Sequence, residues 1–175
     1  MTSHQEATGL SLWLVPEGEI HRRLLGRITE LSRRFGTPPF EPHVTLLPGI
    51  EVDDDTARLR TSELAALLRP IRVQLTSPGH EDEYFRSVFV DVDPSPELLE
   101  ARRLSTRVFG IEGAGPFRPH LSLLYGDLRE EERRQAVDSV AEGGAAFPVR
   151  RLELVRTAGR VEEWGRMAAL ALSGP

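Results

Sequence analysis

The same short pattern occurs twice in this chain, as FEPHVTLL at residues 40–47 and as FRPHLSLL at residues 117–124. Each copy places a histidine two positions before a hydroxyl residue, in the pairs His43 with Thr45 and His120 with Ser122. Successive side chains of an extended strand point to opposite faces, so each histidine shares a face with its hydroxyl. Two such strands packed together would surround one small anionic group with two imidazoles and two hydroxyls. These groups are the ones that acid/base chemistry on a phosphate needs.

A proline precedes the histidine in both copies. Pro42 and Pro119 lack a backbone N–H and hold the residue before them in an extended conformation, so they suit the first position of a strand. They therefore help to set where each strand begins. Of the side chains present, histidine alone has an ordinary pKa, about 6.5, at which it both donates and accepts protons near neutral pH.

Two other interpretations of the repeated histidines compete with catalysis. A lone histidine beside a strand is commonly a structural residue, but two copies in the same local context favour catalysis. A metal site is disfavoured because no carboxylate lies at a ligand spacing beside either histidine. We therefore expect no metal ion and no other cofactor. The remaining histidines are weaker candidates: His4 in the N-terminal stretch, His21 in the first helix and His80 in a polar loop.

The composition bounds the class of protein. A chain of 175 residues with 39% hydrophobic residues fits one domain, residues 1–175, in which residues 1–9 form a flexible tail. The formal net charge of −5 argues against binding to duplex nucleic acid, which needs a basic surface. Every basic residue is Arg, so a P-loop lysine and a Schiff base are excluded. The absence of Cys excludes disulfides and thiol chemistry.

The expected location follows from the apolar runs. The first nine residues are polar, and no apolar run approaches the roughly 18 residues that a membrane-spanning helix needs. We expect a cytoplasmic protein that does not associate with membranes and acts as a monomer.

Hydrophobic periodicity predicts the order β-α-β-α-β-β-α-β-α-β-β. Asp53, Ser95 and Asp127 are typical starts of the last three helices. The two halves of this order correspond roughly, which indicates an internal duplication in an α+β fold, with the repeats on central strands of two antiparallel sheets. The expected strands cover residues 10–15, 43–47, 71–75, 84–92, 120–124, 149–156 and 164–172, and the helices 20–35, 53–68, 95–108 and 127–141.

The two H-x-[TS] strands and their surroundings resemble the 2H phosphoesterase superfamily, in particular its cyclic phosphodiesterase branch. The resemblance rests on SLWLVP at 11–16, FEPHVTL at 40–46, PHLSLLY at 119–125, and the closing Thr157 with Trp164. It covers nearly the whole chain. It implies a bilobal fold with a pseudo-two-fold axis, two sheets flanked by helices, and a metal-independent active site in the cleft between them.

The resemblance also implies a reaction. The substrate would be a small cyclic phosphate, either a nucleoside 2′,3′-cyclic phosphate or ADP-ribose 1″,2″-cyclic phosphate, opened to a monoester. A 2′,3′-cyclic nucleotide would yield the 2′-phosphate. In the expected mechanism His120 takes a proton from water and His43 protonates the leaving oxygen, while Thr45 and Ser122 bind the non-bridging oxygens.

Aromatic residues near the repeats match pocket positions of that family. Trp13 and Tyr125, with Phe85 and Ser87 on the strand expected at 84–92, would bind substrate, the rings stacking on the base. Plain core packing is the alternative role for the rings. Arg86 and Arg118 are further candidates for contact with phosphate, and a solvated surface position is their alternative.

Two rival functions remain open on the sequence. One is RNA 2′,3′-cyclic end processing or 2′-5′ RNA ligase-like chemistry, as in other 2H branches, in which case the partner is an RNA 3′ end. The acidic charge counts against long RNA. The other is a non-catalytic module that binds a phosphorylated nucleotide. Intact histidine pairs count against that, because binding alone needs cations more than titrating imidazoles.

The paired histidines generate a direct prediction. His43→Ala and His120→Ala should each lower turnover of a cyclic phosphate by about 10²- to 10⁴-fold, because each removes a positioned acid or base. Thr45→Val and Ser122→Ala should cost less, because each removes one neutral hydroxyl. Steady-state kinetics on folded variants, checked by circular dichroism, measures this. A folded histidine variant with near wild-type activity would disprove the two-histidine mechanism.

Overall fold

A computed structural model describes residues 5–111 and 115–175 of the chain. Within these residues the elements follow the order predicted from the sequence, with one additional strand and two short 3₁₀ turns. The strands are β1 Leu10–Leu14, β2 Val44–Ile50, β3 Ile71–His80, β4 Val88–Val92, β5 His120–Leu124, β6 Ala146–Val149, β7 Arg151–Arg156 and β8 Gly165–Ala171. The helices are α1 Gly18–Phe35, α2 Asp54–Leu67, α3 Pro96–Phe109 and α4 Glu130–Asp138, and the 3₁₀ turns are η1 Tyr84–Arg86 and η2 Val161–Glu163.

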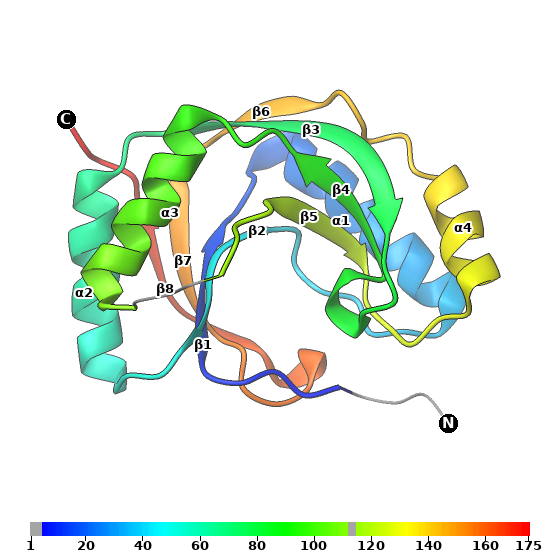
Figure 1. Ribbon diagram of the computed structural model, residues 1–175, viewed down its shortest axis with the longest axis horizontal. Coiled ribbons are helices and arrows are strands. Elements are labelled where there is room, and N and C mark those ends of the chain that lie inside the picture. Colours follow the sequence, from blue (N-terminus) through cyan, green and yellow to red (C-terminus); the bar gives the residue numbers. More distant parts are fainter. Residues whose placement is uncertain (1–4, 112–114) are drawn as a thin grey trace.

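The strands form one strongly curved antiparallel sheet of eight strands, in the order β6-β3-β4-β5-β2-β1-β7-β8 (Figure 1). The α+β class is therefore confirmed. The two sheets expected from the sequence are its two halves, β2-β1-β7-β8 and β5-β4-β3-β6. They join at the middle, where β2 and β5 pair through Val44 and Leu121. These are the two residues that lie between histidine and hydroxyl in the repeats, so the pseudo-two-fold axis passes between the two copies.

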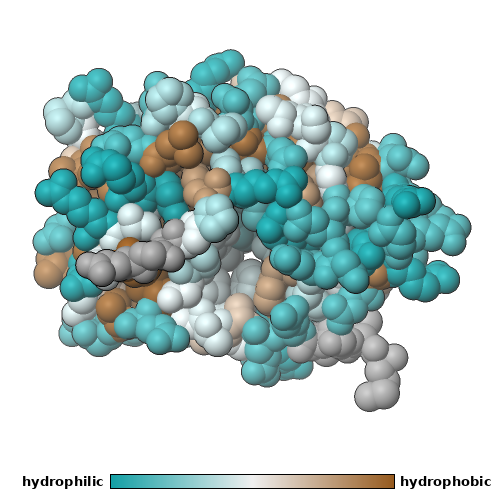
Figure 2. Space-filling model, viewed as in Figure 1, coloured by the Kyte–Doolittle hydropathy of each residue, from teal (hydrophilic) through white to brown (hydrophobic). Residues whose placement is uncertain are grey.

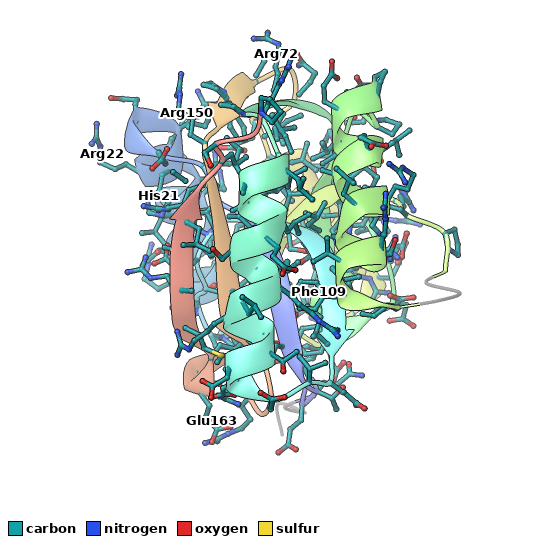
Figure 3. The ribbon with its side chains drawn as sticks, turned by 90° about the vertical axis from the view of Figure 1, so that its left-hand side faces the viewer. His21, Arg22, Arg72, Phe109, Arg150 and Glu163 are labelled. Carbon is teal, nitrogen blue, oxygen red and sulfur yellow. The ribbon has the colours of Figure 1, made fainter. Side chains whose placement is uncertain are left out.

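The helices cover the outer side of each half. α2 contacts β7 and β8 of one half, and α3 lies beside α2 and contacts β2 of that half and β3 of the other (Figure 3). α1 contacts β5, and α4 contacts β3 and β4, over the other half (Figure 1). The element series β1-α1-β2-α2 thus corresponds to β4-α3-β5-α4, as the duplication predicts.

The alternation of side chains along β1 shows how the two faces of the sheet differ. Leu10, Leu12 and Leu14 are buried in the main core under the helices. Trp13 belongs to a separate small cluster with Val15, Val155 and Trp164. Because successive residues of a strand point to opposite faces, this second cluster lies on the inner face of the curved sheet. The inner face is the one that carries the functional side chains.

One expected strand proves to be two. The sequence predicted a single strand over 149–156, but β6 ends at Val149 and β7 begins at Arg151. β6 pairs with β3 in one half of the sheet, whereas β7 pairs with β1 in the other half. Pro148, which cannot donate to a strand partner, lies in β6 at the edge of the sheet. The chain therefore crosses between the halves at Arg150.

Local boundaries also differ from the predicted ones. β2 continues through Pro48 and Gly49, where the pairing with β1 shifts register and Gly49 adopts φ 65°. A bulge of this kind accommodates turn residues inside a strand. Helix α4 begins at Glu130 rather than at Asp127, because the Glu132 carboxylate accepts the Arg129 backbone N–H at 2.9 Å.

Part of the segment expected as a flexible tail, residues 1–9, pairs with the rest of the chain. Residues 1–4 lie outside the described residues. Ala7 forms a backbone bridge with Gly159, and the Gly9 carbonyl accepts the Thr157 N–H at 3.1 Å. Backbone hydrogen bonds of this kind hold the segment against the loop after β7.

The joint between the two halves yields a stability prediction. Leu121 is 0% exposed and pairs with Val44 on β2 and Val90 on β4. Leu121→Ala should lower the free energy of unfolding by about 2–5 kcal/mol, because it leaves a cavity where the halves meet. Leu99→Ala, at a side chain 45% exposed on α3, is the matched control and should change it by less than about 0.5 kcal/mol. Urea unfolding measures both, and equal effects would contradict the packing described.

Candidate active site

Both histidines lie at the start of a central strand and face one cavity. His43 directly precedes β2, and His120 is the first residue of β5. Together with Thr45 and Ser122 they line a cavity of about 450 Å³ on the inner face of the sheet. The structure therefore brings together the four side chains of the repeated pattern. Figure 2 shows the molecule hollowed near the centre of the same view.

The two imidazoles are held in the same way. His43 Nδ1 lies 2.6 Å from the carbonyl oxygen of Glu41, and His120 Nδ1 lies 3.0 Å from that of Arg118. A carbonyl oxygen can only accept, so Nδ1 donates its hydrogen in both rings. In the neutral ring Nε2 is then the atom with a free lone pair. Both carbonyls belong to the residue that precedes the proline of its copy, which explains why the two copies have the same tautomer.

The pKa values show that the free enzyme favours neutral rings. Burial lowers the pKa of His43 from 6.5 to about 4; the hydrogen bond to the Glu41 carbonyl opposes this, and the charge of His120 adds to it. Burial also lowers the pKa of His120, and the nearby Arg86 charge lowers it further. At neutral pH both imidazoles are therefore proton acceptors, until a bound anion raises their pKa values.

The hydroxyls of the repeats are not equivalent. The Ser122 hydroxyl donates to the Phe85 carbonyl at 3.1 Å. Burial raises the pKa of the Tyr125 hydroxyl, and the nearby Ser122 hydroxyl opposes this. Thr45 lines the same cavity, and within the part of the chain that the structure describes its hydroxyl makes no hydrogen bond. Thr45 can donate to a ligand without losing a partner, whereas Ser122 must give up its bond to Phe85.

Aromatic rings form much of the cavity wall. Trp13 stacks on His43 with ring centroids 3.6 Å apart and an angle of 6°, and Tyr125 stacks on Phe40 at 3.7 Å. One face of each of these rings is therefore already covered by the protein. Phe85 and Trp164, 5.7 Å apart, also line the cavity. The structure places Trp13, Phe85 and Tyr125 at the cavity, and their contact with substrate stays a prediction.

Ser87 does not belong to the cavity. The sequence placed it on a strand from 84 to 92, but residues 84–86 form η1 and β4 begins only at Val88. Ser87 is 0% exposed and its hydroxyl donates to the Gly126 carbonyl, so it ties η1 to the loop after β5. The structure therefore places Ser87 away from the cavity, and its predicted role in binding substrate gains no support from this position.

Sequence reasoning missed Phe89, the residue of β4 that lies beside His120. Phe89 lies opposite Ser122 in the register and packs edge-on against His120 at 5.5 Å. It occupies the position on β4 that Trp13 occupies on β1, beside the other histidine. The period-two pattern of the strands, combined with the duplication, could have identified it. Ser11 and Thr157, whose hydroxyl oxygens are 2.9 Å apart, also line the cavity.

The arrangement of possible metal ligands bears on the expected chemistry. Across residues 5–111 and 115–175, no three His, Asp or Glu side chains are arranged to hold a metal ion. Metal independence of the reaction stays a prediction.

Comparisons with known proteins agree with this geometry. The family model described as cyclic phosphodiesterase-like protein matches residues 8–172. A cyclic phosphodiesterase of Arabidopsis thaliana is 29% identical over 153 residues, which are 84% of each chain. A 2′,3′-cyclic-nucleotide 3′-phosphodiesterase of Yarrowia lipolytica is 26% identical, over 89% of this chain and 96% of that protein.

Solved structures share the fold. TT0787 of Thermus thermophilus superposes with a TM-score of 0.63 at 20% identity, over 97% of this chain and 99% of that one. E. coli LigT in its apo form gives 0.60 at 17% identity, with the same coverage. The chain belongs to the family of cyclic phosphodiesterase-like proteins, and it is a phosphodiesterase.

One finding bears on membranes. None of the helices in the described residues combines the length and the apolar character needed to cross a bilayer.

Burial of His43 generates a pH prediction. In the free enzyme, proton NMR should give His43 a pKa of about 4, below its unfolded value of 6.5. The unfolded chain then binds more protons between these values, so the free energy of unfolding falls as the pH drops from 6.5 towards 4. His43→Gln should remove that part of the pH dependence. Adding inorganic phosphate should raise the His43 pKa, and a ring that titrates near 6.5 in the free enzyme would contradict the buried site.

Proposed function

We propose that this phosphodiesterase hydrolyses a nucleoside 2′,3′-cyclic phosphate, ADP-ribose 1″,2″-cyclic phosphate or both to a phosphomonoester by two-histidine acid/base catalysis. One observation carries the proposal: two imidazoles, each with Nδ1 tied to a backbone carbonyl, share one cavity and leave both Nε2 atoms for proton transfer. The names of the Arabidopsis and Yarrowia relatives support the substrate class.

The mechanism assigns one proton transfer to each ring. In the proposed mechanism His120 takes a proton from the attacking water, which its ring can do because burial lowers its pKa and keeps it neutral in the free protein. His43 is 4% exposed and protonates the departing sugar oxygen. It acquires that proton when the anionic phosphate binds, because a nearby negative charge raises a histidine pKa. The indole face of Trp13 against His43 stabilises the charged ring while it holds the proton.

The hydroxyls act on the non-bridging oxygens. As water adds to phosphorus, negative charge grows on these oxygens, and fixed donors lower the barrier. Thr45 donates directly. Ser122 rotates from the Phe85 carbonyl, with Tyr125 beside it as a second hydroxyl. The proton from water ends on His120, and the proton of His43 ends on the leaving oxygen. Release of the His120 proton to solvent then restores the free enzyme.

The rival functions receive less support. A cavity of about 450 Å³ suits a nucleotide-sized ligand, and the net charge of −5 does not favour a long RNA strand. An RNA 3′ end therefore remains the second candidate. A pure binding module would not need two rings whose pKa values are lowered by burial. The monomeric state and the cytoplasmic location stay predictions.

The proposal predicts a single product. A 2′,3′-cyclic nucleotide should yield the 2′-monoester alone, because water attacks from the side of one histidine and the oxygen beside the other departs. The Yarrowia relative is named a 3′-phosphodiesterase, and breaking the bond to the 3′ oxygen leaves the phosphate on the 2′ position. Phosphorus NMR of the products identifies the regioisomer.

Controls separate the alternatives. The double variant His43→Ala with His120→Ala gives the background rate, and EDTA should leave wild-type turnover unchanged. A mixture of 2′ and 3′ products, or no turnover of either substrate class by the folded enzyme, would favour RNA-end processing or binding alone. Loss of activity with EDTA that a divalent cation restores would refute a metal-independent mechanism.

A further inference from the structure

Arg86 is the last residue of η1 and lies at the active site. Of the described residues that line the cavity, Arg86 alone carries a permanent positive charge. The same turn supplies the ring of Phe85 to the cavity wall and the Phe85 carbonyl to the Ser122 hydroxyl. One short turn thus contributes three different groups to the site.

The guanidinium of Arg86 lies near two carboxylates, and its Nη1 is 3.9 Å from that of Glu83. Its Nη2 donates to the Glu81 carboxylate at 2.7 Å. Its Nε is buried and has no hydrogen-bond partner among the described residues. Backbone hydrogen bonds from Arg86 N to the Glu83 carbonyl and from Glu81 N to the Arg86 carbonyl hold the turn. These contacts hold the guanidinium at the cavity wall, where it adds a positive charge.

The position of Arg86 is on the His120 side of the cavity. Its guanidinium lies 5.6 Å from the centre of the Phe89 ring, and His120 packs against the same ring at 5.5 Å. The two side chains are close enough for the Arg86 charge to lower the His120 pKa. A phosphate held between the two imidazoles is then within the field of this guanidinium.

Arg118 is the other arginine near His120, and the structure separates the two. Its side chain is 54% exposed, does not line the cavity, and pairs with Glu81 at 2.6 Å and with Asp91 at 3.2 Å. Arg118 therefore helps to hold Glu81, which in turn holds Arg86. The carboxylate of Glu81 lies between the two arginines and anchors the inner one.

We propose that Arg86 is a phosphate-binding residue, whose guanidinium donates a charge-assisted hydrogen bond to a non-bridging oxygen of the bound phosphate. The inference rests on the proposed function, since it names the charged partner of the phosphate at the same site. Charge-assisted hydrogen bonds of arginine to phosphate are stronger than neutral ones, so Arg86 stabilises the growing charge in addition to the two hydroxyls.

The test uses the full-length chain and inorganic phosphate as the probe. Arg86→Met should weaken phosphate binding by about 10- to 100-fold, the usual effect of losing one hydrogen bond to a charged group. Arg86→Lys keeps the charge without the planar guanidinium and should lie between this variant and wild type. Arg118→Met is the matched control: it removes the other arginine on Glu81 and should keep phosphate affinity within about threefold. Histidine proton shifts in an NMR titration report the binding.

The outcomes distinguish this inference from the proposed function, because phosphate binding does not depend on turnover. Wild-type phosphate affinity in Arg86→Met, an equal loss in Arg118→Met, or no phosphate binding by wild type would overturn the role of Arg86. If Arg86→Met fails to fold, Arg86→Lys decides, and wild-type affinity in that variant refutes the guanidinium contact. If only the Arg86 variants lose phosphate affinity while wild type turns over no cyclic phosphate, the role of Arg86 in phosphate binding is upheld and the proposed hydrolase activity is rejected.

Discussion

The short contact between β2 and β5 is the constraint on which the site depends. The two halves of the sheet meet through Val44 and Leu121, and the residues on either side of this pair point away from the core. Because side chains alternate along a strand, the histidine and the hydroxyl that flank each of these residues share the inner face. Joining two copies at this point places both histidines and both hydroxyls on one cavity. The same register that closes the core therefore assembles the catalytic groups.

Burial around this joint sets the chemistry of the rings. Trp13 covers His43, and Phe89 packs against His120, so both imidazoles are removed from water in a wall that is largely aromatic. Removal from water disfavours the charged form and lowers both pKa values. At His120 the Arg118 carbonyl and the carboxylates of Asp91 and Glu81 oppose this lowering, but burial outweighs them. The negative charge at the site comes with the substrate phosphate, and local groups such as Arg86 interact with it.

The pairs of histidine and hydroxyl, the class of fold and most elements could be predicted because they depend on local patterns. Period-two alternation identifies the central strands, and Ser95 with Pro96 correctly marks the start of α3. The errors arose where distant contacts decide the local structure. Residues 84–86 were predicted as strand, but they form a 3₁₀ turn. The Ser87 hydroxyl donates to the Gly126 carbonyl, and the Gly126 N–H donates to the Tyr84 carbonyl, so the turn is held by the loop after β5. The split at Arg150 depends on which half of the sheet each segment joins.

The sequence by itself determined the chemical groups and the face on which they lie, because residue identity and strand periodicity are local properties. It also determined the tautomer of both rings, through a proline that holds the preceding residue extended beside its own histidine. Only the tertiary structure decided that Arg86 faces the cavity while Arg118 faces solvent, and that Ser122 is bonded to Phe85 while Thr45, among the described residues, is not bonded. These differences come from packing between segments far apart in the chain, and no local pattern encodes which partner a side chain will meet.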